Sequence, residues 1–350
     1  MTTMTEKPGV FGTGLIALDL VIGIDSQTPV HSWAGGTCGN ILAIMSYLGW
    51  DAYPIARMNG DPASERVRVD LAKWGVHLDF TDCAPTGHTP IIIQQIKRAR
   101  DGSPTHRFLW TCPHCGKRLP SYRPVTQDAI EGILPALSKS SVFFLDRVSR
   151  AAISLAAEAA RSGAVVVFEP SGRSDEKLFE EALQIAHVVK YSDQRLSDAG
   201  GPMIGSRATL VEIQTLGSQG LRYRHRLAGE TSGWLSLPPL PAPRLVDTCG
   251  SGDWCTAGFL TAAASKGVEG LKQGGELRIA SALRYGQALA AWNCGFEGAR
   301  GGMYALERQE FERQVDAIIS GKPLLRVVER PQRVEPSVAC PACPRDVSAA

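Results

Sequence analysis

The run most able to do chemistry lies at 247–253 and reads DTCGSGD, directly before a stretch at 254–265 that is predicted to be helical. Small residues at the start of a helix leave backbone N–H groups open, and the helix dipole there favours an anion. A carboxylate in the same turn, Asp253, can take a proton from an alcohol that attacks phosphorus while the amides hold the developing charge. The run also fits an ordinary glycine-rich turn with an aspartate that caps the helix.

A second run, GGTCGN at 35–40, has the features of a site for a hydroxylated ligand. Gly35 and Gly36 let such a ligand approach the backbone closely, and Asn40 offers a diol both a donor and an acceptor. Together the two runs resemble the G-G-x-x-x-N and D-T-x-G-x-G-D signatures of the ribokinase (PfkB) family of sugar kinases. The resemblance covers about residues 8–325, in order and with ordinary spacing.

The resemblance implies roles for individual residues. On the substrate side these are a catalytic base, Asp253; an anion hole, Gly250, Ser251 and Gly252; and sugar ligands, Asp19, Gly35, Gly36, Asn40 and Asp146. On the nucleotide side they are Ser192, Arg195, Thr215, Gly217, Gly220 and Asn293. The resemblance also implies that Asp247 and Thr248 help to bind a monovalent cation such as K⁺. A turn aspartate at Asp19, a surface ion pair of Asp146 with Arg147 and a helix-terminal cap at Asn293 are the alternative interpretations.

One family feature is missing. Relatives usually carry N-x-x-E after the strand that ends near residue 190, where this chain has Ser192 and Arg195. That glutamate helps to organise water around Mg²⁺, a role that a cation cannot take over. Asp193 could substitute for it; otherwise we expect weak activity, or phosphate handling rearranged around Arg195.

Two cysteine pairs predict a metal site that the family does not ordinarily carry. Cys112 and Cys115, followed by Gly116, have the form of a zinc knuckle, and Cys340 and Cys343 repeat it near the C-terminus. Two such knuckles make one tetrahedral four-thiolate Zn²⁺ site, which would join the tail to the segment at 111–120. Redox pairs or unrelated thiols are the alternatives. The other five of the nine cysteines are interpreted as small buried hydrophobic residues.

The elements that must position these residues follow an α/β rhythm. Continuous apolar runs at 142–145, 164–168, 187–190 and 209–214 predict strands buried on both faces, hence a mostly parallel sheet between helix layers. The other predictions are a strand at 10–15, helices at 40–48, 62–74 and 151–161, a hairpin at 221–226 and 234–237, and a β lid from 20–34 and 89–110. We therefore expect a ribokinase-like three-layer α/β/α fold over 8–325, with the cysteine module at 111–120 and 331–350.

Composition narrows the function classes. The 350 residues are 44% hydrophobic and 21% charged with a net charge of +2, which predicts a large core and argues against a nucleic-acid coating protein. No apolar run suggests a membrane span or signal peptide, and cysteine pairs without a signal peptide predict the cytoplasm.

We expect an ATP-dependent, Mg²⁺-assisted kinase that phosphorylates a hydroxymethyl group of a sugar or sugar-like molecule. A nucleoside kinase is the alternative within the fold, since Trp33, Phe108 and Trp110 could stack on a base. A catalytically weak, ligand-binding regulator is the alternative from another class. Because relatives often dimerise through the lid, the resemblance also implies a homodimer formed through the lid.

Overall fold

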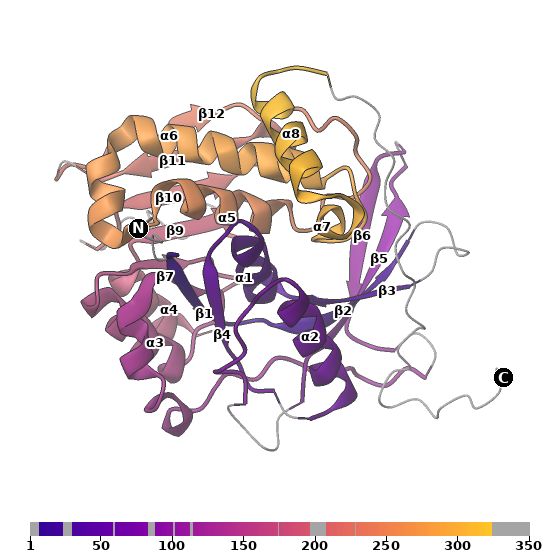
Figure 1. Ribbon diagram of the computed structural model, residues 1–350, viewed down its shortest axis with the longest axis horizontal. Coiled ribbons are helices and arrows are strands. Elements are labelled where there is room, and N and C mark those ends of the chain that lie inside the picture. Colours follow the sequence, from indigo (N-terminus) through magenta and orange to yellow (C-terminus); the bar gives the residue numbers. More distant parts are fainter. Residues whose placement is uncertain are drawn as a thin grey trace, which may run out of the picture.

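The computed structural model describes residues 7–23, 30–58, 60–82, 88–100, 102–112, 115–173, 175–196, 208–227 and 229–323. Within these residues the strands form two sheets (Figure 1). The large sheet has the order β12-β11-β10-β9-β8-β7-β1-β4, and its neighbours are parallel from β10 to β4. The small sheet has the order β3-β2-β5-β6. The predicted α/β class with a mostly parallel central sheet is confirmed.

The large sheet contains the apolar runs that the sequence marks. Its strands are β1 (Gly9–Thr13), β4 (Asp51–Ile55), β7 (Ser140–Leu145), β8 (Val165–Phe168), β9 (Val188–Ser192), β10 (Val211–Thr215), β11 (Leu221–His225) and β12 (Leu235–Leu237). β4 escaped prediction because Pro54 interrupts its pattern. A proline is tolerated there because β4 is an edge strand, where one missing N–H donor leaves no ladder partner unsatisfied.

Helices cover both faces of the large sheet. On one face lie α1 (Thr37–Tyr47), α5 (Ser251–Ala263) and α6 (Gly267–Asn293), and on the other lie α3 (Arg150–Arg161) and α4 (Glu176–Ile185). Alternate strand residues feed the two cores: Phe144 packs on the α1 side, while Phe143 packs on the α3 side. The remaining helices are α2 (Pro62–Lys73), α7 (Gly301–Ala305) and α8 (Arg308–Ile319). The result is three layers.

The small sheet consists of β2 (Ala17–Ile22), β3 (His31–Gly35), β5 (Ile91–Arg98) and β6 (Pro104–Leu109), the region predicted as the lid. It stands beside the large sheet, next to α2 and α7 (Figure 1). Leu18 and Leu20 of β2 pack into the main core, so Asp19 lies on the opposite face. On that opposite face Asp19 pairs in register with Ile92 of β5.

The helix ends follow their sequence signals. The Asp61 side chain accepts a hydrogen bond from Ser64 N at 2.7 Å and caps α2, whose first residue is Pro62. Its second oxygen accepts from Thr89 N at 3.0 Å, which ties α2 to the chain that enters β5. The same aspartate therefore fixes both a helix start and the position of the small sheet.

Candidate active site

The predicted base lies at the start of α5. This helix begins at Ser251, so Asp253 is in its first turn, as expected. Gly250 precedes it with φ 75°, and a Cβ there would come within 2.4 Å of the Ala299 carbonyl oxygen. Only glycine fits this position. The Ser251 N–H of the same turn donates to Thr248 O at 3.2 Å, so this amide is already bonded within the loop.

Asp253 is held by Asn40 from α1. The Asn40 Nδ2 donates to Asp253 Oδ2 at 2.8 Å. Although part of Asp253 stays exposed to solvent, desolvation raises its pKa to about 7, and the charge of Glu169 adds to the rise. Asn40, Lys190 and Arg195 act in the opposite direction. A carboxylate that titrates near neutral pH is suited to accept a proton from an alcohol.

An arginine that the sequence reasoning did not single out orients Asn40. Arg300 is 1% exposed, and its Nε donates to Asn40 Oδ1 at 3.2 Å. Its Nη2 donates to Ala34 O on β3 and to Asp70 Oδ2 on α2, the latter at 2.8 Å. Because the guanidinium takes the amide oxygen, the Asn40 NH₂ group is left facing Asp253. The sequence offers no local signal for this role, since Arg300 and Asn40 lie 260 positions apart.

The predicted sugar ligands gather next to this pair. Asp19 Oδ2 accepts from Gly36 N at 3.4 Å, and a Cβ on Gly35 would lie 1.9 Å from the same oxygen. Burial raises the pKa of Asp19 to about 7, while Gly36 N–H and Arg300 lower it. Asp19 Oδ1 is buried without a hydrogen-bond partner among the described residues. An acceptor in this state is ready for a ligand hydroxyl.

Asp146 lies directly after β7, at the carboxyl edge of the large sheet. Its Oδ1 accepts from Leu15 N at 2.9 Å and its Oδ2 from Arg147 Nη1 at 2.8 Å. Burial raises its pKa, and Arg147 and the Leu15 N–H oppose that rise. The carboxylate is 1% exposed, which is inconsistent with the surface ion pair that was the alternative interpretation.

Beneath the start of α5 lies a buried ion pair that sequence reasoning missed. Lys190 Nζ, on β9, donates to Glu169 Oε1 at 2.7 Å and to the Gly252 carbonyl at 3.2 Å. Thr256 Oγ1 donates to Glu169 Oε2 at 2.7 Å. These contacts fix the first turn of α5 over the ends of β8 and β9. The signal was present: a lysine inside an apolar strand, and a glutamate directly after one.

The predicted nucleotide residues occupy the neighbouring strand ends. Ser192 and Thr215 are the last residues of β9 and β10 and are paired in register. Gly217 and Gly220 follow in a tight turn with φ 57° and φ 94°. Arg195 is exposed and acts on Asp253 through its charge.

Asn293 lies at the end of α6, apart from those strand ends. Its Nδ2 donates to Cys249 O at 3.2 Å, while its Oδ1 is buried without a hydrogen-bond partner in the described part of the chain. The Asn293 side chain therefore holds the loop before α5 through the Cys249 carbonyl.

Asp247 joins the signature loop to the small sheet. Its Oδ2 accepts from Gln94 Nε2 of β5 at 2.6 Å and from Gly298 N at 2.9 Å, and its Oδ1 accepts from Cys249 N at 3.0 Å. His106 Nδ1 of β6 lies 3.5 Å from Oδ1. Burial raises the pKa of Asp247, but these hydrogen bonds outweigh it and lower the pKa overall.

Comparison with known proteins decides the family. The profile of the pfkB family carbohydrate kinases matches residues 23–305. The chain belongs to this family. PH1459 of Pyrococcus horikoshii, described as an uncharacterized sugar kinase, is 25% identical over 272 residues, which are 74% of this chain and 82% of that protein. Membership makes the protein a carbohydrate kinase by class.

Solved structures agree on the fold. A ribokinase from Giardia lamblia aligns with TM-score 0.68 and 16% identity, over 90% of this chain and 99% of that one. A fructokinase from Xylella fastidiosa, solved with bound ATP, aligns with TM-score 0.66 and 16% identity over 90% and 99%. A Burkholderia thailandensis nucleoside kinase in complex with inosine aligns with TM-score 0.63 and 18% identity over 90% and 98%.

The cysteine module is only partly visible. Gly116 N donates to Cys112 O and Cys112 N donates to Lys117 O, both at 2.9 Å, which closes a tight turn. Cys340 and Cys343 lie outside the described residues. Among the residues that the structure describes, no group of three His, Cys, Asp or Glu side chains is arranged to hold a metal ion. No helix in the described ranges is long and apolar enough to cross a membrane.

Proposed function

We propose that the protein transfers the γ-phosphoryl group of ATP to a hydroxymethyl group of a sugar, with Asp253 as the catalytic base. The observation that carries this proposal is the contact of Asn40 with Asp253 at the open N-terminus of α5. A carboxylate and the donor that fixes it then lie at a helix N-terminus, where the helix dipole favours a bound anion.

The reaction would proceed in line. Asp253 takes the hydroxyl proton as the alcohol oxygen bonds to the γ-phosphorus and the bond to the β-phosphate oxygen breaks. The amides of Gly250, Ser251 and Gly252 bear the charge that develops on the phosphoryl oxygens. Asp19 and Asp146 accept hydrogen bonds from the other sugar hydroxyls. The proton on Asp253 then passes to solvent, because its pKa near 7 holds it only weakly.

Mg²⁺ enters as the usual partner of ATP, whose phosphate charge it neutralises. Two carboxylates near the strand ends, Glu169 and Asp193, are candidates to help bind Mg²⁺, and only one of them is available. Glu169 is occupied by Lys190 and Thr256, while Asp193, which follows β9, is exposed. Asp193 is therefore the residue we assign to metal-bound water, with Ser192, Arg195, Thr215, Gly217 and Gly220 along the ATP.

The test is ADP release from the purified full chain over a panel of neutral sugars, sugar acids, sugar phosphates and nucleosides. Release with one substrate that disappears in Asp253→Asn supports the proposal. Ligand-induced melting shifts without ADP release from any substrate would instead identify a ligand-binding regulator, the reading that the Arg195 replacement motivates.

Nucleoside phosphorylation is the second candidate. Phe108 of β6 is 38% exposed and pairs in register with Gln94, whose side chain reaches Asp247. An exposed ring on that face could stack on a base. Trp33, in contrast, stacks between His31 and Tyr304 and is already occupied. A nucleoside substrate would lose affinity in Phe108→Ala, whereas a sugar would not.

We also propose a structural Zn²⁺ held by the thiolates of Cys112, Cys115, Cys340 and Cys343. The turn at Cys112 with Gly116 at φ 68° supports it, since a zinc knuckle needs such a bend. Metal analysis of the full chain should then find about one zinc per chain by the four-thiolate rule. Cys340→Ser should release it, and a metal-free native preparation would reject the site. The K⁺ site at Asp247 and Thr248 and the homodimer stay predictions.

A further inference from the structure

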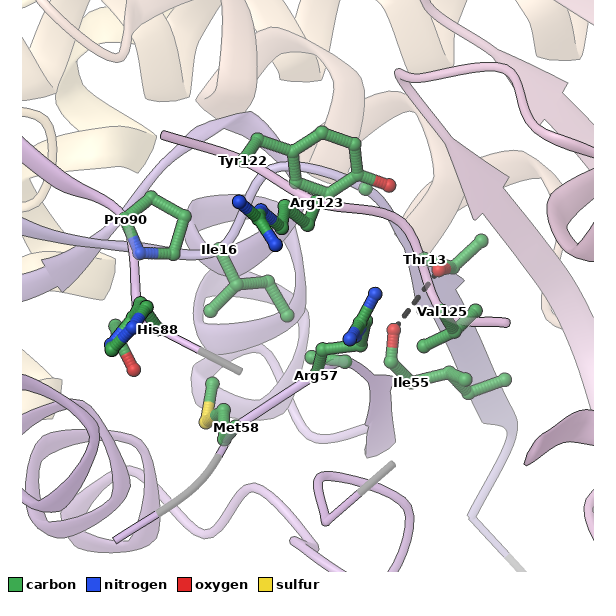
Figure 2. A pocket seen from close by; sticks show the side chains of 13 residues that line it. Thr13, Ile16, Ile55, Arg57, Met58, His88, Pro90, Tyr122, Arg123 and Val125 are labelled. Carbon is green, nitrogen blue, oxygen red and sulfur yellow. Dashed lines mark hydrogen bonds between the residues drawn. The ribbon is translucent and has the colours of Figure 1, made fainter. Parts of the chain in front are cut away.

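A small pocket opens at the end of the large sheet away from the nucleotide residues. Thirteen described residues line a narrow hollow that is partly open to solvent. Its walls come from the ends of β1 and β4, from the chain that enters β5 and from the segment after Tyr122 (Figure 2). The proposed phosphotransfer does not yet use it.

Basic side chains line the pocket. Arg57, Arg123 and His88 contribute to it, and none of the thirteen described lining residues is acidic. Arg57 Nε is buried and has no hydrogen-bond partner among the described residues, while its Nη1 reaches only Pro124 O at 3.4 Å. This N–H donor is therefore available to an acceptor on a ligand.

The pocket shares a wall with the expected sugar site. Gly14, which lines it, lies against Asp146, so close that a Cβ there would come within 1.7 Å of Asp146 Oδ1. Tyr122, another lining residue, packs against Ala17 and Ile92. Ala17 lies on the same face of β2 as Asp19.

The strand order sets the distance between this pocket and the base. The first turn of α5 is fixed to β8 and β9, whereas the pocket begins at the end of β1, two strands beyond β8. At roughly 4.8 Å per strand this separation is about 10 Å. An extended six-carbon chain together with an arginine side chain spans a gap of that order.

We infer that this pocket binds an anionic group, a carboxylate or a phosphate, at the end of the substrate remote from the reacting hydroxyl. The substrate class is then a sugar acid or a sugar phosphate, an inference that rests on the proposed phosphotransfer. Guanidinium groups match both anions because their planar N–H fork pairs with two oxygens at once. Arg57 approaches from the β4 side and Arg123 from beside Tyr122 (Figure 2).

The first experiment measures ADP release with two matched pairs: D-glucose with its aldonic acid D-gluconate, and D-fructose with D-fructose 6-phosphate. We expect kcat/KM for one anionic substrate to exceed that of its neutral parent on the order of 10- to 100-fold, the range of a charge-assisted hydrogen bond. Comparing the sugar acid with the sugar phosphate shows whether the pocket prefers a carboxylate or a phosphate group.

Variants then locate the effect. Arg57→Met and Arg123→Met should each reduce the preference for the anionic substrate by about 10-fold or more, with the KM for ATP unchanged. Arg57→Lys should restore part of it, since it keeps the charge but not the fork. Arg161→Met, at an exposed position near the end of α3, is the matched control. Equal use of neutral and anionic substrates, unaffected by these variants, would overturn the inference.

A binding measurement tests the anion pocket independently of the proposed phosphotransfer. Calorimetry of gluconate and fructose 6-phosphate with the inactive Asp253→Asn variant, with and without Arg57→Met, needs no turnover. Arg57-dependent binding without ADP release from any compound would support the pocket and reject the phosphotransfer. Turnover of neutral sugars, with no binding of either anion, would reject the pocket and leave the phosphotransfer standing.

Discussion

At the scale of single residues, the proton affinity of Asp253 is set by opposed neighbours. Desolvation and the charge of Glu169 raise its pKa, while the Asn40 amide, Lys190 and Arg195 stabilise the carboxylate. The balance leaves a pKa of about 7. The carboxyl group is therefore mostly ionised above that pH and mostly protonated below it. If Asp253 is the base, as proposed, activity depends on pH near neutrality.

The raised pKa of Asp253 predicts how activity depends on pH. Activity should fall as pH drops through about 7, because protonated Asp253 cannot accept the hydroxyl proton. Asn40→Ala should move this acid limb to higher pH, since the lost hydrogen bond stabilised the charged form. A pH–rate profile of kcat/KM checks both. An acid limb in the variant at or below its wild-type position would contradict the assignment.

Arg300 contacts Asn40, which in turn contacts the proposed base, Asp253. Arg300→Met should lower kcat by roughly 10- to 100-fold and move the acid limb upward, because the Asn40 amide loses the contact that fixes its orientation. Tyr304→Phe is the matched control, since it removes bonds to Asp70 but leaves the Arg300–Asn40 contact in place. If both variants shift the limb equally, Arg300 has only a structural role.

At the scale of elements, the start of α5 depends on backbone shape. Gly250 must adopt a left-handed φ and lie against the Ala299 carbonyl, and Lys190 and Thr256 both bond to the Gly252 carbonyl from below. The amide cradle is thus built by the residues around the helix start as much as by the signature itself.

Gly250→Ala tests that dependence. A side chain there meets both the conformational cost of roughly 1–2 kcal/mol and a clash with backbone that cannot move aside. We expect loss of nearly all ADP release and a lower midpoint of thermal unfolding. Gly49→Ala, also at positive φ but with open space around it, should lose stability and keep activity. Comparable inactivation in both variants would count against the cradle.

At the scale of the whole molecule, the small sheet is docked onto the site by polar contacts. Gln94 and His106 reach Asp247 from β5 and β6, and Arg300 reaches Ala34 at the end of β3. Three strands of one sheet thereby meet the loops that precede α5 and α7. Closure over the site would exclude water from the transferred phosphoryl group.

Gln94→Ala should loosen that docking. Asp247 keeps its bonds to Cys249 N and Gly298 N, so the fold should survive. We expect a several-fold higher KM for the sugar and faster hydrolysis of ATP without sugar, measured as ADP release. Lys97→Ala, an exposed change on the same strand, should alter neither. Unchanged ATP hydrolysis in Gln94→Ala would argue that the small sheet does not gate water.

The sequence by itself determined the family and the parallel sheet, and it singled out Asn40 and Asp253 as candidate site residues. These depend on local signals: glycines that permit special backbone, a helix start, and continuous apolar runs. The predicted strand and helix bounds lie within a few residues of the observed ones. No bounds were predicted for β4, whose proline hid an edge strand, or for α4, α6, α7 and α8.

Only the tertiary structure decided which charges face one another. Arg300 lies 260 positions from Asn40, and Glu169 meets Thr256 across 87. Arg57 and Arg123 line one pocket although they lie 66 positions apart in the sequence. Such pairs carry no local pattern, since a buried charge is stabilised by whatever the fold brings next to it. Contacts between such residues could be identified only from the three-dimensional structure, which brings distant segments of the chain together.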